Sequence, residues 1–98
     1  MDKVWFVSDD KISEVKDKVF KDETINRASI TIRSAKSLDF NKEGNFLIIN
    51  GAEEIINHAK EILNPLSEEA EEDEAMEVVT RLKDSEDNVA AGLSGIFG

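Results

Sequence analysis

The sequence predicts an α+β fold in which a small antiparallel sheet of three or four strands carries two helices on one face. Two kinds of segment occur along the chain. Some have the apolar patterns of strands, and others have apolar residues three and four positions apart, as in helices. The order of these segments is β-α-β-β-α. The chain has 98 residues, of which 40% are hydrophobic, and this suffices for one small core.

The first predicted strand and helix lie near the N-terminus. Residues 4–7 form an uninterrupted apolar run of β-prone types, which predicts a strand buried on both faces. Residues 8–10 are Ser, Asp and Asp, and each is a good helix N-cap. Ile12, Val15 and Val19 then fall on one face of a helix. Because Val and Ile are weak helix formers, this helix must be stabilised by packing.

The middle of the chain predicts two strands joined by a turn. Residues 28–33 alternate apolar and polar types, which is the clearest half-buried strand pattern in the chain. Leu38 and Phe40 keep the same parity, so the strand is expected to resume after an irregular patch. Residues 41–44, Asn-Lys-Glu-Gly, have hairpin-turn chemistry. Residues 46–49 are apolar throughout and predict a returning strand in the centre of the sheet.

The strongest helical pattern follows Gly51. Six apolar residues between positions 52 and 63 fall at i, i+3, i+4, i+7, i+10 and i+11. Glu53 and Glu54 lie in the first turn, where the helix dipole favours acids. Pro65 prevents the helix from continuing. The five elements to this point follow the ferredoxin-like order, which ends with one further strand.

The pattern of residues 76–82 leaves the sixth element open. As a closing edge strand, this segment would place its even-numbered residues on one face. As a helix, it would place Ala75, Val78, Val79 and Leu82 on one face. The surrounding Glu, Ala, Met, Arg, Leu and Lys residues favour the helix.

The charge is concentrated in the second half of the chain. The chain has 12 Lys and Arg and 22 Asp and Glu, so its net charge is −10. Residues 1–49 carry nine acids and nine bases, and seven acids fall between positions 68 and 77. Runs of like charge are typical of tails and solvated helix faces. We therefore expect a globular body over residues 1–64 and an acidic C-terminal arm over residues 65–98, helical or partly disordered, with Pro65 at the join.

Composition also excludes several classes of function. A net charge of −10 argues against a nucleic-acid-binding protein, which needs a basic phosphate-binding surface. The longest apolar run is four residues, so no segment is expected to span a membrane. The chain has no cysteine, and its charged first residues lack the apolar stretch of a secretory signal. A cytoplasmic location is the simplest expectation.

No set of residues predicts catalysis or a cofactor. His58 is the only histidine, and it is expected at the edge of the buried face of its helix. The acids at 68–77 include no glycine and lack the spacing of a calcium loop, so they predict a solvated face. No phosphate-loop, G-x-S-x-G or H-E-x-x-H pattern occurs. We therefore expect a protein that is not an enzyme and has no catalytic residues, metal site or cofactor.

The C-terminus carries a recognisable pattern. Residues 85–98 begin with an acidic stretch, continue with small residues and end in Gly-Leu-Ser-Gly-Ile-Phe-Gly. This tail resembles that of archaeal ribosomal stalk proteins, although the mixed α and β body departs from the helical N-terminal part of that family. The resemblance implies a short helix that docks into an apolar groove on a translation factor. Its anchors would be Val89, Leu93, Ile96 and Phe97.

The sequence therefore predicts a small, non-enzymatic protein-interaction module. Its acidic arm and apolar end would engage a protein partner with a basic or apolar groove, for instance a translation factor. An alternative for the tail is that its apolar residues fold back onto the protein's own sheet.

A second hypothesis is a small-ligand-binding or regulatory module that dimerises through its sheet. The ligand would lie near two strand-to-helix turns, with Ser8 and Asp9 in the first and Asn50 and Gly51 in the second. The pattern does not decide the oligomeric state.

Overall fold

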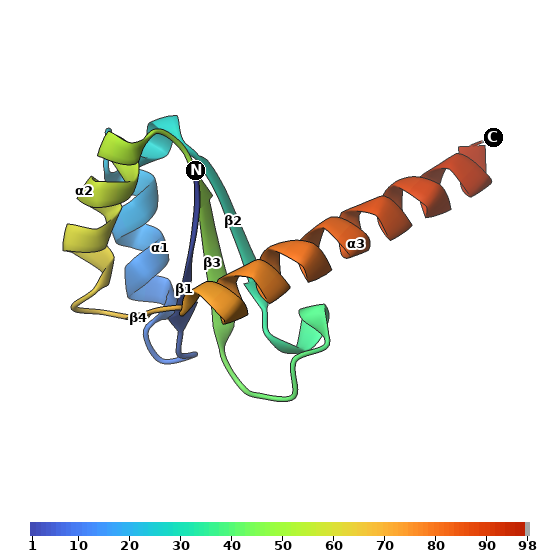
Figure 1. Cartoon of the computed structure of the whole chain (residues 1–98), viewed down its shortest axis with the longest axis horizontal. Helices are drawn as coiled ribbons and strands as arrows, with labels where there is room; N and C mark the ends of the chain where they lie inside the picture. Colours follow the sequence, from blue (N-terminus) through green and yellow to red (C-terminus); the bar gives the residue numbers. More distant parts are fainter. Residues whose placement is uncertain (98) are drawn as a thin grey trace.

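The computed structural model describes the backbone of residues 1–97 and the side chains of residues 1–84. It confirms the predicted α+β class with a four-stranded antiparallel sheet and three helices (Figure 1). The elements are β1 (Asp2–Val7), α1 (Ile12–Lys21), the 3₁₀ turn η1 (Ile25–Arg27), β2 (Ser29–Ser34), the 3₁₀ turn η2 (Lys36–Leu38), β3 (Asn45–Asn50), α2 (Glu53–Leu63), β4 (Glu68–Glu69) and α3 (Glu72–Phe97).

The strands lie in the order β2-β3-β1-β4, and each is antiparallel to its neighbours. The apolar strands β1 and β3 occupy the centre, as their composition predicts. β4 has only two residues, which pair with Trp5 and Phe6. The sequence did not indicate this strand, because its two glutamates carry no apolar alternation and it forms where the edge of β1 offers backbone partners.

The first face of the sheet is covered by α1, η1 and α2. Its core contains the fully buried Trp5 and Leu47 from the central strands, and Val15 and Ile56 from the two helices. Ile25 of η1 is also fully buried. Because α1 and α2 both contribute to this core, both predicted helices cover one face. The indole Nε1 of Trp5 donates a hydrogen bond to the side-chain oxygen of Asn64 at 3.0 Å.

The second face of the sheet has its own core, covered by α3 and the connection between β2 and β3. Val4 and Ile48 of the sheet pack there with Val78 and Leu82 of α3. The segment 76–82 is therefore a helix, which was one of the two alternatives. Leu38 also packs on this face, although its parity placed it on the first face.

The connection between β2 and β3 differs from the predicted continuation of a strand. After Ser34 the chain forms η2, and Asp39 takes a left-handed conformation with φ of 65°. This bend carries Leu38 and Phe40 round to the second face. Gly44 has a φ of 117°, as its place in the turn predicts, and a Cβ there would overlap the ring of Phe6.

Residues 68–82 take part in the packing of the body, whereas the sequence placed them in an arm that begins at Pro65. Ala70, Val78 and Leu82 are all at least 90% buried in the second core. The physical reason is that the second face of the sheet presents apolar side chains that need cover. The charge run does not prevent this packing, because a helix can place its acids outward and its apolar residues inward.

Candidate functional site

The second face of the sheet around α3 carries the most distinctive surface. On one side, α3 is fixed to the connection between β2 and β3 by Arg81. Its guanidinium donates hydrogen bonds to the backbone carbonyls of Leu38 at 3.0 Å and Asp39 at 2.7 Å, and it lies 4.3 Å from the ring centre of Phe40. It also forms an ion pair with Glu77 at 2.6 Å. These contacts hold the first half of α3 toward the Ser34 end of β2.

On its other side, α3 leaves a groove above the sheet. A hollow of about 490 Å³ lies between α3 and the start of β1, and it is mainly apolar. A second hollow of about 240 Å³ lies between α3, β2 and β3. Asp2 and Val79 line both hollows, so we treat them as one continuous surface, the α3 groove. The α3 groove is lined by Met1, Asp2, Lys3, Val4, Ser29, Thr31, Ile48, Asn50, Ala70, Glu72, Ala75, Met76, Val79, Thr80, Leu82 and Lys83.

Two methionines at the rim of the α3 groove expose large apolar side chains. Met1 is 62% exposed and Met76 is 65% exposed. Methionine is flexible and polarisable, and it is common on surfaces that accept apolar partners. The sequence did not single out this groove, because it is formed by residues from four elements and the N-terminus. The wide apolar stripe of Ala75, Val78, Val79 and Leu82 was the one available signal.

The acids between positions 68 and 77, apart from Glu72, line a different hollow, near β4. This hollow contains Glu68, Glu71, Glu74 and Glu77, and Lys42 lies in it, 3.3 Å from the carboxylate of Glu74. The carboxylate of Glu69 instead faces the ammonium groups of Lys3 at 2.8 Å and Lys60 at 3.7 Å. Lys3 holds the pKa of Glu69 below its ordinary value. The acidic run is therefore partly paired with bases of the body.

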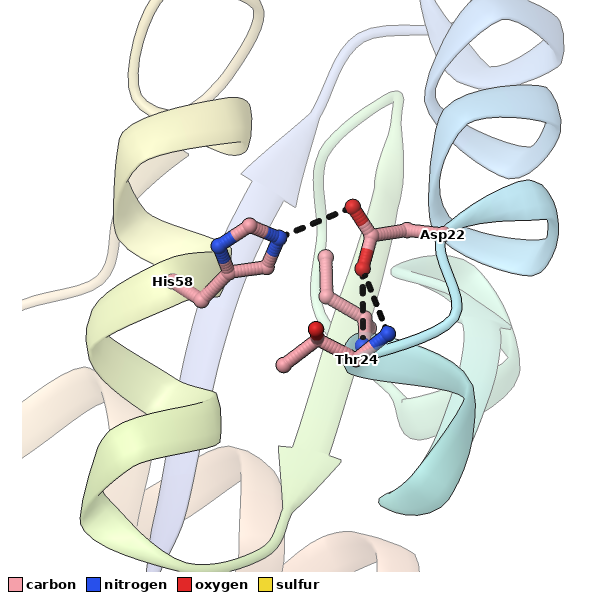
Figure 2. A network of polar contacts seen from close by, with 4 residues as sticks. Asp22, Thr24 and His58 are labelled. Carbon is pink, nitrogen blue, oxygen red and sulfur yellow. Dashed lines mark hydrogen bonds and ion pairs between the residues drawn. The ribbon is translucent and has the colours of Figure 1, made fainter.

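Asp22 and His58 form a polar clamp between the end of α1 and α2 (Figure 2). One carboxylate oxygen of Asp22 accepts hydrogen bonds from the backbone N–H groups of Thr24 and Ile25, both at 2.9 Å. The other oxygen lies 2.8 Å from Nε2 of His58. The N–H of Ile25 and then His58 lower the pKa of Asp22. The side chain of His58 is 37% exposed, in agreement with the edge position expected for it.

The clamp fits a structural role. It orders the turn that buries Ile25 and ties it to α2, which lies 36 residues further along the chain. Among the side chains that the structure describes, the recorded partner of His58 is Asp22 alone. No group of three or more His, Asp or Glu side chains within residues 1–84 is arranged to hold a metal ion.

The two turns expected to share a ligand lie at opposite ends of the sheet. Val7, just before Ser8 and Asp9, pairs with Asn45, whereas Asn50, just before Gly51, pairs with Asp2. The reason is that β1 and β3 are antiparallel neighbours, so the C-terminal end of one lies beside the N-terminal end of the other. Asp9 accepts a hydrogen bond from Asn45 at 2.9 Å, and Asn50 donates one to Asp2.

Ser8, Asp9 and Asp10 also do not cap α1. Lys11 occupies the N-cap position without a side-chain hydrogen bond. The hydroxyl of Ser8 instead donates to the carboxylate of Asp10 at 2.5 Å, which lowers the pKa of Asp10. The three residues therefore bond among themselves and to Asn45 rather than to the helix.

The predicted anchors Val89, Leu93, Ile96 and Phe97 have side chains outside the described residues. The backbone that carries them is part of α3, which is one helix of 26 residues. Figure 1 shows the second half of α3 extending away from the sheet, on the side opposite α1 and α2. Within the chain as far as Phe97, no helix is long and apolar enough to cross a membrane.

No known protein family, curated protein or solved structure matches this chain.

Proposed function

We propose that this protein is a small, non-enzymatic interaction module that binds a protein partner through the second half of α3, residues 85–97. One observation carries the proposal: α3 is a continuous helix whose first half packs on the body and whose second half extends beyond the sheet (Figure 1). A helix that extends past its own sheet can present its outer turns to a partner, and residues 85–97 make up about three and a half turns. We further propose that the body has a ferredoxin-like arrangement and supports this helix.

The sequence pattern of the helix supports this proposal. At about 100° per residue, positions 89, 93 and 96 lie within about 40° of the direction of Leu82. The apolar stripe that packs on the sheet at Val78 and Leu82 therefore continues along the outer half of the helix. Apolar residues at this spacing are typical of helices that bind in grooves.

Charge indicates the chemistry of the partner. Asp84, Glu86 and Asp87 precede the apolar positions, and seven more acids lie between positions 68 and 77. Acids beside an apolar stripe steer a helix toward a basic surface with an apolar groove. The resemblance to stalk tails makes a translation factor in the cytoplasm the first partner to test.

The test uses the full chain with two substitutions in the outer helix, Leu93→Ser and Ile96→Ser. The matched control carries Asn88→Ser and Ala91→Ser, because by spacing these positions lie away from the apolar stripe. Proteins captured from a cell extract by the unchanged chain are purified, and their affinity for all three chains is measured by calorimetry.

We expect the apolar pair of substitutions to weaken binding by about tenfold or more, and the control to bind as the unchanged chain does. Binding should also weaken as salt is raised, because the acids act over the Debye length. Equal affinity of all three chains would contradict the proposal. Circular dichroism of each variant checks that the helix is retained.

A further inference from the structure

We propose that the protein forms a symmetric dimer in which β2 of each copy pairs with β2 of the other. In this dimer, the outer half of each α3 lies in the α3 groove of the second copy. This inference rests on the proposed function, since it names a second copy of the chain as a partner of the same helix. Four observations support it: an open strand edge, its self-complementary sequence, the position of the groove and the length of the helix.

The outer edge of β2 offers unpaired backbone groups. β2 is the terminal strand of the sheet and pairs on one side with β3. Ala35, just after β2, lies opposite Gly44 when the register of β2 and β3 is continued, and its N–H donates a hydrogen bond to the carbonyl of Gly44 at 2.9 Å. Odd-numbered residues of β2 therefore direct their N–H and C=O groups toward β3, and Ile30 and Ile32 direct theirs toward the open edge. An open edge of this kind is a template for another strand.

The sequence of β2 complements itself. It reads Ser-Ile-Thr-Ile-Arg-Ser from Ser29 to Ser34. A two-fold axis at Thr31 places Ile30 opposite Ile32 of the second copy, and Thr31 opposite its own counterpart. The outward backbone groups of the two isoleucines then form hydrogen-bonded pairs on both sides of the axis. The guanidinium of Arg33 donates a hydrogen bond to the carbonyl of Ile32 at this edge, at 2.9 Å, and its exposed side chain can move aside.

The groove lies where this symmetry requires it. The contacts of Arg81 hold α3 toward the Ser34 end of β2, and the α3 groove lies toward the Ser29 end. Because paired β2 strands are antiparallel, the Ser34 end of one copy lies beside the Ser29 end of the other. The α3 helix of the second copy would therefore pass over the α3 groove of the first copy. Both α3 helices would lie on the same face of the joined sheet.

The outer half of α3 has the length that the groove needs. Residues 85–97 rise by about 1.5 Å each, which gives roughly 20 Å. Four strands about 4.8 Å apart span about 14 Å between the outermost two. The outer half is therefore long enough to cross the sheet of the second copy. Its last turn would reach the apolar hollow with the exposed Met1 and Met76.

The distribution of charge is compatible with this partner. The acids at positions 68–77 begin at β4, the edge of the sheet opposite to β2, so the dimer keeps the two acidic runs at its ends. β2 carries a single charge, Arg33. Lys83 lines the α3 groove near β2, where the acidic residues 84–87 of the second copy would pass. The groove itself is balanced in charge, because its lining contains the acids Asp2 and Glu72 and the bases Lys3 and Lys83.

The first test is the mass of the full chain in solution. Sedimentation equilibrium should give twice the chain mass of 10.9 kDa at high concentration, with dissociation on dilution. A mass of one chain at every concentration up to about the millimolar range would overturn the inference.

The pairing of β2 is tested by disulfide formation. The chain has no cysteine, so single cysteines act as specific probes. Residues facing each other across an antiparallel pair without hydrogen bonds have Cα atoms about 4.5 Å apart, within the range of a disulfide. We expect Thr31→Cys to form a covalent dimer on oxidation. Ser29→Cys alone and Arg33→Cys alone should not, whereas a mixture of these two should.

Equal cross-linking of all three single variants, or none in any of them, would overturn the proposed pairing.

The position of α3 is tested with Leu93→Ser and Ile96→Ser in one chain. We expect its dimerisation to weaken by about tenfold or more relative to the Asn88→Ser and Ala91→Ser control. Unchanged dimerisation would overturn the docking of α3 in the groove.

The two proposals fail in different ways. A monomeric chain whose outer helix binds another protein would support the proposed function and overturn the dimer. If the chain dimerises and its outer helix binds no other protein, the dimer is supported and the proposal that the helix binds a different protein is contradicted. A chain that is monomeric and captures nothing through its outer helix would contradict both.

Discussion

Asp22 shows how one side chain can fix the relation of two distant elements. Its carboxylate accepts hydrogen bonds from two backbone N–H groups and contacts His58 of α2. The turn that it orders places Ile25, which is fully buried, in the first core. The residue that caps the end of α1 thus helps to order the turn that brings Ile25 into the core.

Replacing this side chain should destabilise the protein in a pH-dependent way. We expect Asp22→Ala to lower the free energy of unfolding at pH 7 by about 1 kcal/mol, because two backbone N–H groups lose their acceptor. The pKa of Asp22 is lowered in the folded state. Its contribution is therefore present above the unfolded pKa of about 4 and is lost as the pH falls through the folded pKa.

Urea denaturation at pH 7 and near pH 3 measures this difference. The gap between Asp22→Ala and the unchanged chain should narrow at the lower pH. Asp17→Ala serves as control, since Asp17 is exposed and, among the side chains of residues 1–84, forms its ion pair with Lys21 on the same helix. A gap that widens in acid would refute the role given to the carboxylate.

At the scale of elements, the two halves of α3 have different surroundings. Its first half buries Val78 and Leu82 against the second face of the sheet. Its second half continues beyond the sheet, as Figure 1 shows. The many acids of this segment do not reveal the difference between the two halves. The charge of a segment does not depend on which side of the helix its acids lie, whereas burial does.

Truncating a buried residue of α3 should affect the stability of the whole body. We expect Leu82→Ala to lower the free energy of unfolding by about 2–3 kcal/mol, since the side chain is 8% exposed and leaves a cavity. Thr80→Ala, at an exposed position of the same helix turn, should change it little. Chemical denaturation followed by the fluorescence of Trp5 in the opposite core measures both variants. An independent arm would leave that signal unchanged.

At the scale of the molecule, the two edges of the sheet differ. One edge is formed by the two-residue strand β4, whose Glu69 forms ion pairs with Lys3 and Lys60, whereas within residues 1–97 no strand pairs with the outer side of β2. A dimer through β2 links folding to association. We therefore expect the melting temperature of the full chain to rise by several degrees over a roughly hundredfold increase in concentration.

Differential scanning calorimetry across that range checks this expectation. The Leu93→Ser, Ile96→Ser variant should show a smaller rise than the unchanged chain. A melting temperature independent of concentration would speak against association in the folded state.

The parts of the fold that sequence could predict are those whose signal is local. Residues 28–33 and 52–63 each repeat one period over enough positions to define a face, and both formed as expected. The orientation of neighbouring strands has no such local signal, so the turns at Asp9 and Gly51 were wrongly placed together. β4 was missed because its pairing is set by the edge of β1.

The candidate site was predicted less well than the fold. The α3 groove depends on where α3 crosses the sheet, and this depends on distant contacts such as those of Arg81 with the carbonyls of Leu38 and Asp39. The clamp of Asp22 and His58 joins residues 36 positions apart, which no spacing rule relates. The role of the outer helix stays a prediction that rests on its apolar spacing.

The continuity of α3 changes the thermodynamics of any binding by its outer half. A tail that becomes helical only on its target must first form a helical nucleus, and a nucleation constant near 0.001 corresponds to about 4 kcal/mol. In this protein the nucleus already exists, because the first half of α3 is held on the sheet by Val78, Arg81 and Leu82. The outer half therefore extends an existing helix, and a partner receives a preformed ligand. Separating the tail from the body as a free peptide should weaken its binding even if every contact residue is retained.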